Sequence, residues 1–353
     1  MTSSSRMSRP FAAALAVALI AALASAGCRK EGGGTSGGSG GVAGGGGVAG
    51  ARARLAEKMQ RGEKIVVGFS QMENDGPWRI AETASMRDEG AKRAAKYQLL
   101  VTDAQGQTSK QVSDVEDLIA RGVDVLFLAP REEQGFESAL AAAREKSIPV
   151  FLIDREVNGK AGEDFVTFVG SNFVEEGRRA GEWLVKQTNG KAGIVELLGT
   201  SGASVARDRH DGFADAIKGS PDMKILTSQT ANFNRAQGQK VMENIIQAQG
   251  RNITVVYAHN DEMALGAAQA LKAAGMQPGK DVIVLSVDGE KAALEAIQRG
   301  EMSATVECNP RFGPVAFDTL EKFLRGEQLP AKIINQDRFF DSSNAAQFVA
   351  EAY

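Results

Sequence analysis

The segment ITVVYAHNDEMALGAAQALKAAGMQPGKDVIVLSVDGE (253–290) contains two short apolar runs joined by one amphipathic stretch. The runs ITVVYAHN (253–260) and DVIVLSVD (281–288) have the length and the β-branched content of buried strands. Residues 261–274 between them are predicted to form a helix. Continuous apolar strands joined by amphipathic helices indicate βα units in a parallel sheet that helices cover on both faces.

The same alternation extends from Lys64 to the C-terminus. The further predicted strands are 65–70, 99–104, 123–130, 149–154, 165–171, 192–199, 223–230, 302–309 and 333–340. The further predicted helices are 78–96, 109–121, 136–146, 174–188, 205–218, 235–248, 290–299 and 314–325. Because one open sheet of about ten strands is less common than two smaller sheets, the sequence predicts an α/β protein with two doubly wound parallel-sheet lobes.

The N-terminal region has a different composition. Arg6 and Arg9 precede an apolar stretch, Phe11–Ala26, that is too short to span a bilayer comfortably and ends in small residues just before Cys28. Small residues directly before a cysteine resemble the lipobox of bacterial lipoproteins. We therefore predict a signal peptide at 1–27, acylation of Cys28, and a lipoprotein held at the membrane in the periplasm or at the cell surface. The alternative is an ordinary secretory signal, with Cys28 incidental.

Residues 31–50 read EGGGTSGGSGGVAGGGGVAG and have the composition of a flexible linker. We predict a tether over residues 28–62, in which residues 51–62 show a short helical pattern. Cys28 and Cys308 are the only cysteines, so a cysteine-rich zinc site is excluded, and a disulfide between them is not expected.

Composition and motifs argue against several classes of function. The net charge of -3 offers no basic surface for nucleic acid. The chain contains two histidines, His210 and His259, and has neither a G-x-S-x-G elbow nor an H-E-x-x-H motif. His259 is expected to be packed and neutral, and Gly199-Thr200-Ser201-Gly202 is only a weak match to a phosphate-binding loop. No catalytic residue, cofactor or metal site is predicted.

Polar and aromatic residues gather where predicted strands end, which is where open parallel sheets bind ligands. They are Glu73, Asn74, Asp75, Trp78 and Arg79 after 65–70; Asp154 and Arg155 after 149–153; Arg207 and Arg209 after 192–199; Asn232, Phe233 and Asn234 after 223–230; Asn260 and Asp261 after 253–259; and Asp288 after 281–287. Each has a structural alternative: Asp261 suits a helix N-cap, Asp154 and Arg155 suit an ion pair, and Trp78 suits a core.

The combination of these residues indicates the class of ligand. Carboxylate, amide and guanidinium groups satisfy the paired donors and acceptors of sugar hydroxyls, and aromatic rings suit the C–H faces of a sugar. Ligand pockets are mostly apolar with few polar groups, so a cluster this rich in charge favours a polar ligand. The sequence therefore predicts a binding protein for a small polar molecule, and this combination of groups favours a sugar.

A family resemblance is carried by VGFSQ with WRIAET, FLIDR, VELLGTSGASVARDR with GFADAIK, VYAHNDEMALGAAQALKAAG with PGKD, Asp288-Gly289 and VECNPRFGPVAFDTLEKF. From about Lys64 to Tyr353 the chain resembles the periplasmic sugar-binding proteins of ribose-binding type, which serve ABC transporters. Within that family it is most similar to the galactofuranose-binding members.

The resemblance implies a type I periplasmic binding fold with three chain crossings, near Ser171, Cys308 and Asp337. The lobes would comprise residues 63–170 with 309–336 and residues 171–308 with 337–353. The resemblance implies sugar contacts from Trp78, Arg79, Asp154, Arg155, Arg209, Asn260 and Asp288, with Phe233 against the sugar ring. Together with Asn74, these residues are the predicted site.

The implied function is binding without chemistry. A monomer would close on a monosaccharide, galactofuranose or a similar sugar, and deliver it to an ABC permease. The acidic loop 73–77 and Cys308 depart from the family pattern and leave the exact sugar open. The alternatives are a receptor that feeds a chemotaxis or sensor-kinase pathway, a sugar-responsive repressor core and an exported enzyme. The signal sequence disfavours the repressor, and the lack of catalytic motifs disfavours the enzyme.

Overall fold

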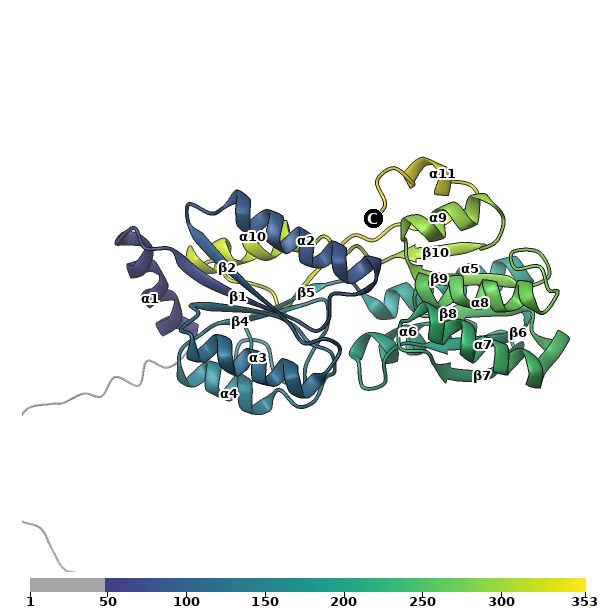
Figure 1. Ribbon diagram of the computed structural model, residues 1–353, viewed down its shortest axis with the longest axis horizontal. Coiled ribbons are helices and arrows are strands. Elements are labelled where there is room, and N and C mark those ends of the chain that lie inside the picture. The colour runs from purple at the N-terminus through teal and green to yellow at the C-terminus, as the bar shows by residue number, and fades with distance from the viewer. Residues whose placement is uncertain (1–47) are drawn as a thin grey trace, which may run out of the picture. The chain divides into compact units, whose positions relative to one another are not determined.

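A computed structural model of the chain describes residues 48–353. The predicted signal peptide (1–27), the predicted acylation site Cys28 and the predicted tether as far as residue 47 lie outside these residues. The described chain forms two lobes, each built on a sheet of six strands with helices on both faces (Figure 1). This arrangement is the predicted α/β architecture.

The N-terminal lobe contains a wholly parallel sheet with the strand order β11-β5-β4-β3-β1-β2. Helices α2 and α10 cover one face, and α3 and α4 cover the other (Figure 1). The bounds are β1 Ile65–Gln71, β2 Tyr97–Asp103, β3 Val125–Ala129, β4 Val150–Ile153, β5 Thr167–Gly170, β11 Lys332–Ile334, α2 Gly76–Lys92, α3 Thr108–Ala120, α4 Glu137–Glu145 and α10 Gly313–Leu324.

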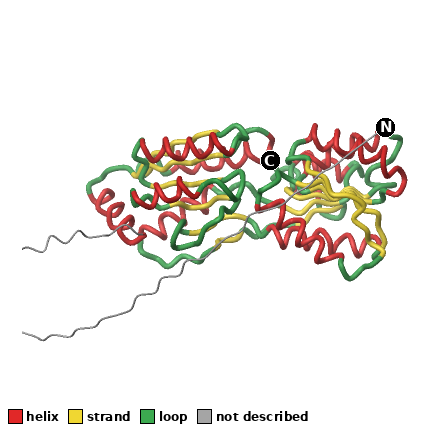
Figure 2. Tube along the Cα trace, turned by 90° about the horizontal axis from the view of Figure 1, so that it is seen from below, coloured by secondary structure: helices red, strands yellow, loops and turns green. Residues whose placement is uncertain are grey.

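The C-terminal lobe repeats this plan with the order β12-β10-β9-β8-β6-β7, in which only β12 runs antiparallel to its neighbour. Figure 2 shows the strands of both sheets between layers of helices. The bounds are β6 Lys191–Leu198, β7 Asp222–Thr230, β8 Val255–Ala258, β9 Ile283–Asp288, β10 Ala304–Glu307, β12 Phe339–Asp341, α5 Phe173–Thr188, α6 Ser204–Ile217, α7 Arg235–Gln249, α8 Asp261–Ala273, α9 Lys291–Gln298, α11 Ala345–Phe348 and the 3₁₀ turn η1 Gly250–Asn252.

The chain passes between the sheets after β5, after β10 and between β11 and β12. The prediction of one strand over 333–340 is therefore wrong. Residues 332–334 pair with β5 in the N-terminal sheet, whereas residues 339–341 pair with β10 in the C-terminal sheet. The four polar residues 335–338 separate the two apolar pairs, and the chain crosses between the sheets at this interruption.

Helix α1 (Val48–Gln60) corrects the predicted tether, which was expected to extend to residue 62. Leu55 is fully buried on the N-terminal lobe. Arg54 Nη1 and Lys58 Nζ lie 2.8 and 2.5 Å from the two carboxylate oxygens of Asp124, which precedes β3. A buried leucine and a shared carboxylate therefore hold this helix on the lobe.

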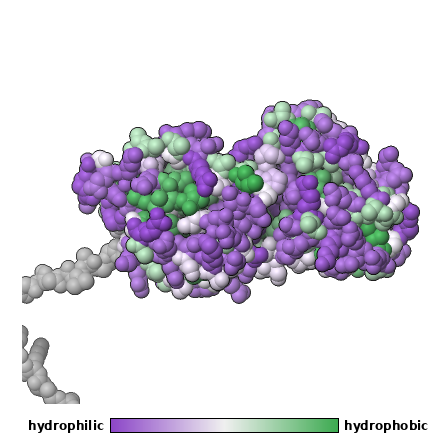
Figure 3. Space-filling view, viewed as in Figure 1, coloured by the Kyte–Doolittle hydropathy of each residue, from purple (hydrophilic) through white to green (hydrophobic). Residues whose placement is uncertain are grey.

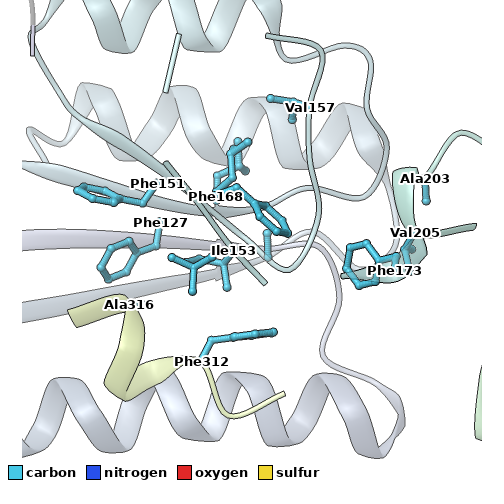
Figure 4. Packing of buried hydrophobic residues seen from close by; sticks show 14 of the residues in the cluster. Phe127, Phe151, Ile153, Val157, Phe168, Phe173, Ala203, Val205, Phe312 and Ala316 are labelled. Atoms are coloured by element: carbon cyan, nitrogen blue, oxygen red, sulfur yellow. The ribbon is translucent and has the colours of Figure 1, made fainter. Parts of the chain in front are cut away.

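The core of the N-terminal lobe is rich in aromatic rings in edge-to-face contact. Phe127 lies 5.7 Å from Phe151 and 5.4 Å from Phe317, measured between ring centroids. Figure 4 shows that this apolar cluster continues past Phe168 to Phe173 and Val205, which belong to the C-terminal lobe. A second cluster fills the C-terminal lobe beneath α7 and α8. The lobes therefore share apolar packing around the crossings.

Helix ends in the C-terminal lobe follow from capping residues. Asn172, Asn234 and Asn260 precede α5, α7 and α8, and each side-chain oxygen accepts from a backbone N–H in the first turn. The prediction of Asp261 as a cap is therefore wrong, because Asn260 occupies that place.

Within residues 48–353 the helices are all too short or too polar to span a bilayer. Hydrophilic residues dominate the face drawn in Figure 3.

Candidate functional site

A cavity of about 470 Å³ lies at the carboxyl ends of strands from both sheets. All the predicted site residues except Asn74 line it: Trp78, Arg79, Asp154, Arg155, Arg209, Phe233, Asn260 and Asp288. Asn74 is exposed on the loop between β1 and α2, outside the cavity lining. Its place after a strand end was a weak signal, because that loop is long enough for one side chain to point away.

Several lining residues were not predicted as ligand contacts, among them Arg131, Val205, Arg235, Glu262 and Glu290. Arg131 stands two residues after β3, so the strand-end rule applied to it as well. Glu290 stands two residues after β9, where it precedes α9. Val205, Arg235 and Glu262 lie in first turns of helices, and only the folded chain brings those turns to the cavity.

The cavity wall mixes charges of both signs. The acidic residues are Glu73, Asp75, Asp154, Glu262, Asp288 and Glu290, and the basic residues are Arg79, Arg131, Arg155, Arg209 and Arg235. The charges nearly balance, so the wall offers donors and acceptors without a strong net field. Such a lining suits a neutral ligand with many hydroxyl groups better than an ion.

Arg79 is held rigidly in the N-terminal half of the site. Its Nη1 donates to Glu82 Oε2 at 2.7 Å, and its Nη2 donates to Asp154 Oδ2 at 2.6 Å. Burial opposes the cation, yet Asp154 and Glu82 keep the pKa of Arg79 above its ordinary value. The guanidinium lies 4.4 Å from the ring centroid of Trp78, whose Nε1 donates to the backbone oxygen of Cys308 at 2.8 Å.

Arg155 is equally buried but poorly paired. Its Nη1 donates to the backbone oxygen of Arg131 at 2.9 Å, and its Nε lies 3.5 Å from Asp154 and makes no hydrogen bond within residues 48–353. Burial, with repulsion from Arg79, lowers the pKa of Arg155 to about 10. A buried guanidinium with free donors on a cavity wall is a group ready to bind a ligand oxygen.

Arg209 carries the C-terminal half of the site. Its Nε donates to Glu176 Oε2 at 2.8 Å, its Nη1 donates to the backbone oxygen of His259, and its Nη2 lies 3.3 Å from Asp288 Oδ1. Burial opposes the cation, but Glu176 and Asp288 raise the pKa of Arg209 well above its ordinary value. Three anchors from three segments therefore fix the orientation of this guanidinium.

Phe233 lies between the two halves. The guanidinium carbons of Arg155 and Arg209 are 5.1 and 6.0 Å from its ring centroid. The ring packs on Gly199, where an added Cβ would lie 1.9 Å from Phe233 Cζ. This contact explains the glycine after β6 without a phosphate loop.

Backbone strain gathers at the site. Asp154, Asn232, Phe233 and Asp288 have φ values of 65°, 53°, 57° and 128°. Non-glycine residues in this region are uncommon and persist where the surrounding structure holds them, often at ligand-binding positions. The Phe233 backbone is held by Asn260, whose Nδ2 donates to the Phe233 carbonyl oxygen at 3.2 Å.

The two histidines share one buried carboxylate behind the site. Glu196 of β6 is fully buried and lies 2.9 Å from His210 Nδ1 and 3.1 Å from His259 Nε2. Burial lowers the pKa of His259, and this favours the packed, neutral state expected for that residue.

Among residues 48–353, no group of three or more His, Cys, Asp or Glu side chains is placed to hold a metal ion.

Comparison with known proteins gives concordant results. Residues 42–328 match the model of a periplasmic binding protein domain. The galactofuranose-binding protein YtfQ of Escherichia coli (strain K12) is 44% identical over 272 residues, which are 76% of this chain and 85% of YtfQ. The ribose import binding protein RbsB of Bacillus subtilis (strain 168) is 35% identical, over 77% of this chain and 85% of RbsB.

Solved structures agree with the sequence relatives. A crystal structure of a galactofuranose binding protein superposes with a TM-score of 0.79 at 41% identity and covers 81% of this chain and 98% of its own. The binding component of the arabinose ABC transporter from Shewanella sp. ANA-3, bound to α- and β-L-arabinofuranose, gives 0.78 at 39% identity and covers 81% and 95%. All four relatives are named as binding proteins and not as enzymes; RbsB is an import binding protein, and the Shewanella protein is the binding component of an ABC transporter.

Proposed function

The chain belongs to the periplasmic binding protein family with the type I fold, and on this premise we propose that it binds one neutral monosaccharide between its lobes. The observation that carries the proposal is the contrast between Arg155, whose Nε has no hydrogen bond within residues 48–353, and Arg209, whose orientation is fixed, both close to the ring of Phe233. A sugar supplies oxygens for the guanidinium groups and a C–H face for the ring.

We propose a furanose sugar, with galactofuranose first among the candidates. Support comes from the names of the relatives: a galactofuranose-binding protein and a protein bound to L-arabinofuranose are both close to 40% identical to this chain. Further support comes from the site itself, because Trp78, Arg79, Asp154, Arg155, Arg209, Phe233, Asn260 and Asp288 line one cavity. Asn74 is left out of this proposal.

The proposed cycle is closure of two lobes, residues 63–170 with 309–336 and residues 171–308 with 337–353. A ligand that contacts both lobes shifts the equilibrium toward the closed form. The closed protein, a monomer held by a lipid on Cys28, then delivers the sugar to an ABC permease. The import names of the relatives support transport over the sensory alternative.

A thermal-shift screen of the full chain tests this proposal. The panel is D-galactose, L-arabinose, D-fucose, D-ribose and D-fructose, together with a methyl galactofuranoside. A ligand that binds only the native state stabilises it by about 2.7 kcal/mol at a hundredfold excess over Kd. We expect a large shift with a small set of furanose-forming sugars, and none of comparable size in Arg155→Met. Absence of a shift with every monosaccharide would contradict sugar binding.

A further inference from the structure

Glu176 is a buried carboxylate outside the cavity lining. It stands in the first turns of α5, just after the first crossing, and its exposed fraction is 2%. Oε2 accepts the hydrogen bond from Arg209 Nε at 2.8 Å, and Oε1 has no partner within residues 48–353. The neighbouring Gly177 permits this contact, because a Cβ there would lie 2.2 Å from the Arg209 backbone oxygen.

The three crossings meet beside this carboxylate. Cys308 Sγ, after β10, lies 3.6 Å from Ser171 Oγ, after β5. Asp337, between β11 and β12, accepts from the backbone N–H of Asn309 at 3.1 Å. The Asp337 carboxylate repels the buried carboxylate of Glu176. One polar cluster therefore joins all three crossings to the arginine of the site.

We propose that Glu176 is a positioning residue that orients Arg209 toward the ligand and couples the site to the crossings on which the lobes move. This inference rests on the proposed sugar binding. Within the described residues 48–353, the charged partners of Arg209 are Glu176 and Asp288. Since Asp288 lies at 3.3 Å and itself lines the cavity, Glu176 supplies the shorter contact and the one that leaves a ligand undisturbed.

Coupling of this kind makes sugar affinity depend on pH. Burial raises the pKa of Glu176 to about 7 against the attraction of Arg209, and Asp337 adds to the rise. Protonation removes the charge-assisted bond to Arg209, so affinity falls as the pH drops below about 7. The ionisable groups that face Glu176 from the elements packed on it are Arg209 of α6, Tyr257 of β8, Asp288 of β9, Cys308 after β10 and Asp337 between β11 and β12.

The experiment measures Kd of the full chain by calorimetry, for the sugar found in the screen, from pH 5.5 to 8.5. For the wild type we expect binding roughly tenfold weaker at pH 5.5 than at pH 8.5. Glu176→Gln should bind roughly tenfold more weakly at pH 8.5 and show a flat profile. Glu175→Gln is the matched control, because Glu175 lies in the same turn, pairs with Arg178 at the surface and should leave the profile unchanged.

A wild-type Kd that does not change with pH, or a Glu176→Gln profile identical to the wild type, would overturn the coupling while leaving sugar binding intact. A wild type that binds no sugar would overturn the proposed function and this inference together. If Glu176→Gln fails to fold, Arg209→Lys takes its place, because an ammonium group does not reproduce the guanidinium contacts to Glu176 and Asp288 together. A wild-type slope retained in Arg209→Lys would then contradict the coupling.

Discussion

The two halves of the site hold their arginines in opposite ways. Arg209, in the C-terminal half, has Glu176, Asp288 and a backbone oxygen as partners. Arg155, in the N-terminal half, donates to one backbone oxygen and lies 3.5 Å from Asp154. Both are buried, yet the pKa of Arg209 is raised and that of Arg155 is lowered to about 10. A buried cation with full pairing stabilises the folded site, whereas one with free donors can still bind the oxygens of a ligand.

The largest expected effect is a loss of stability when Arg209, in the C-terminal half of the site, is replaced. Arg209→Met leaves the buried Glu176 and Asp288 without their cation, so it should lower the free energy of unfolding by about 3–5 kcal/mol, besides weakening sugar binding. Urea denaturation without ligand measures this change. Arg178→Met, which changes a half-exposed arginine paired on α5, is the control and should cost under about 1 kcal/mol. An Arg209 variant as stable as the control would refute the contrast between the halves.

The next effect concerns acid stability of the C-terminal lobe, which holds both histidines. Burial opposes ionisation of Glu196, but hydrogen bonds from His210 and His259 lower its pKa from 4.5 to about 2. A lowered carboxylate pKa contributes stability above pH 4.5 that is lost as the pH falls toward 2, about 3 kcal/mol in all.

Glu196→Gln should therefore be less stable at neutral pH by about 3 kcal/mol and should lose less stability between pH 4.5 and 2 than the wild type. Chemical denaturation at several pH values measures both quantities. Glu182→Gln, which removes a half-exposed carboxylate of α5, is the control. Parallel pH curves for the wild type and Glu196→Gln would contradict the role given to this carboxylate.

Replacing Arg155, in the N-terminal half of the site, should affect binding more than stability, unlike replacing Arg209. Arg155→Met removes a poorly paired buried cation, so the unfolding free energy should stay within about 1 kcal/mol of the wild type, or rise. Sugar affinity should fall by about 2 kcal/mol, roughly 30-fold, through lost charge-assisted bonds. Calorimetry and denaturation together separate the two effects, and Arg144→Met, exposed on the same lobe, should change neither. A large loss of stability in Arg155→Met would contradict the claim that Arg155, unlike Arg209, contributes little to the stability of the fold.

The smallest effect concerns an ion pair between the lobes. Glu133, after β3, lies 2.6 Å from Arg207 Nη1 on α6, and the backbone N–H of Glu133 donates to the Gly202 oxygen at 2.9 Å. Because Arg207 is half exposed, Arg207→Met should weaken binding by less than about 1 kcal/mol, and less so at high salt. A double-mutant cycle with Glu133→Gln isolates the pair. A coupling near zero at low salt would show that this contact does not favour closure.

Much of the fold follows from local pattern. Each strand over 65–171 and 192–288 was predicted within two residues or so of its observed bounds, because buried parallel strands are short apolar runs between helices. The exceptions lie where pattern is ambiguous. Asn260 and Asp261 are both good capping residues, and only the helix itself decides that Asn260 caps while Asp261 bonds to Thr305 and the Glu290 N–H.

The site was predictable in outline from a topological rule, since strand ends of a parallel sheet meet at one edge. That rule, with the family resemblance, led to Arg155, Arg209 and Asp288, all of which line the cavity. It did not lead to Glu290, whose carboxylate oxygens are buried without partners within the described chain, or to Glu176 behind Arg209. Both are helix-start glutamates that resemble ordinary first-turn acids in sequence.

The sequence by itself determined the two α/β lobes, their strand and helix order and the edge at which ligand residues gather, because these depend on short-range periodicity and on the geometry of parallel sheets. Only the tertiary structure decided that residues 332–334 and 339–341 belong to different sheets, that α1 packs on the N-terminal lobe and that Arg155 and Arg209 differ in pairing. Those outcomes depend on which distant groups share a buried space, and burial and pairing are properties of the folded chain rather than of local sequence.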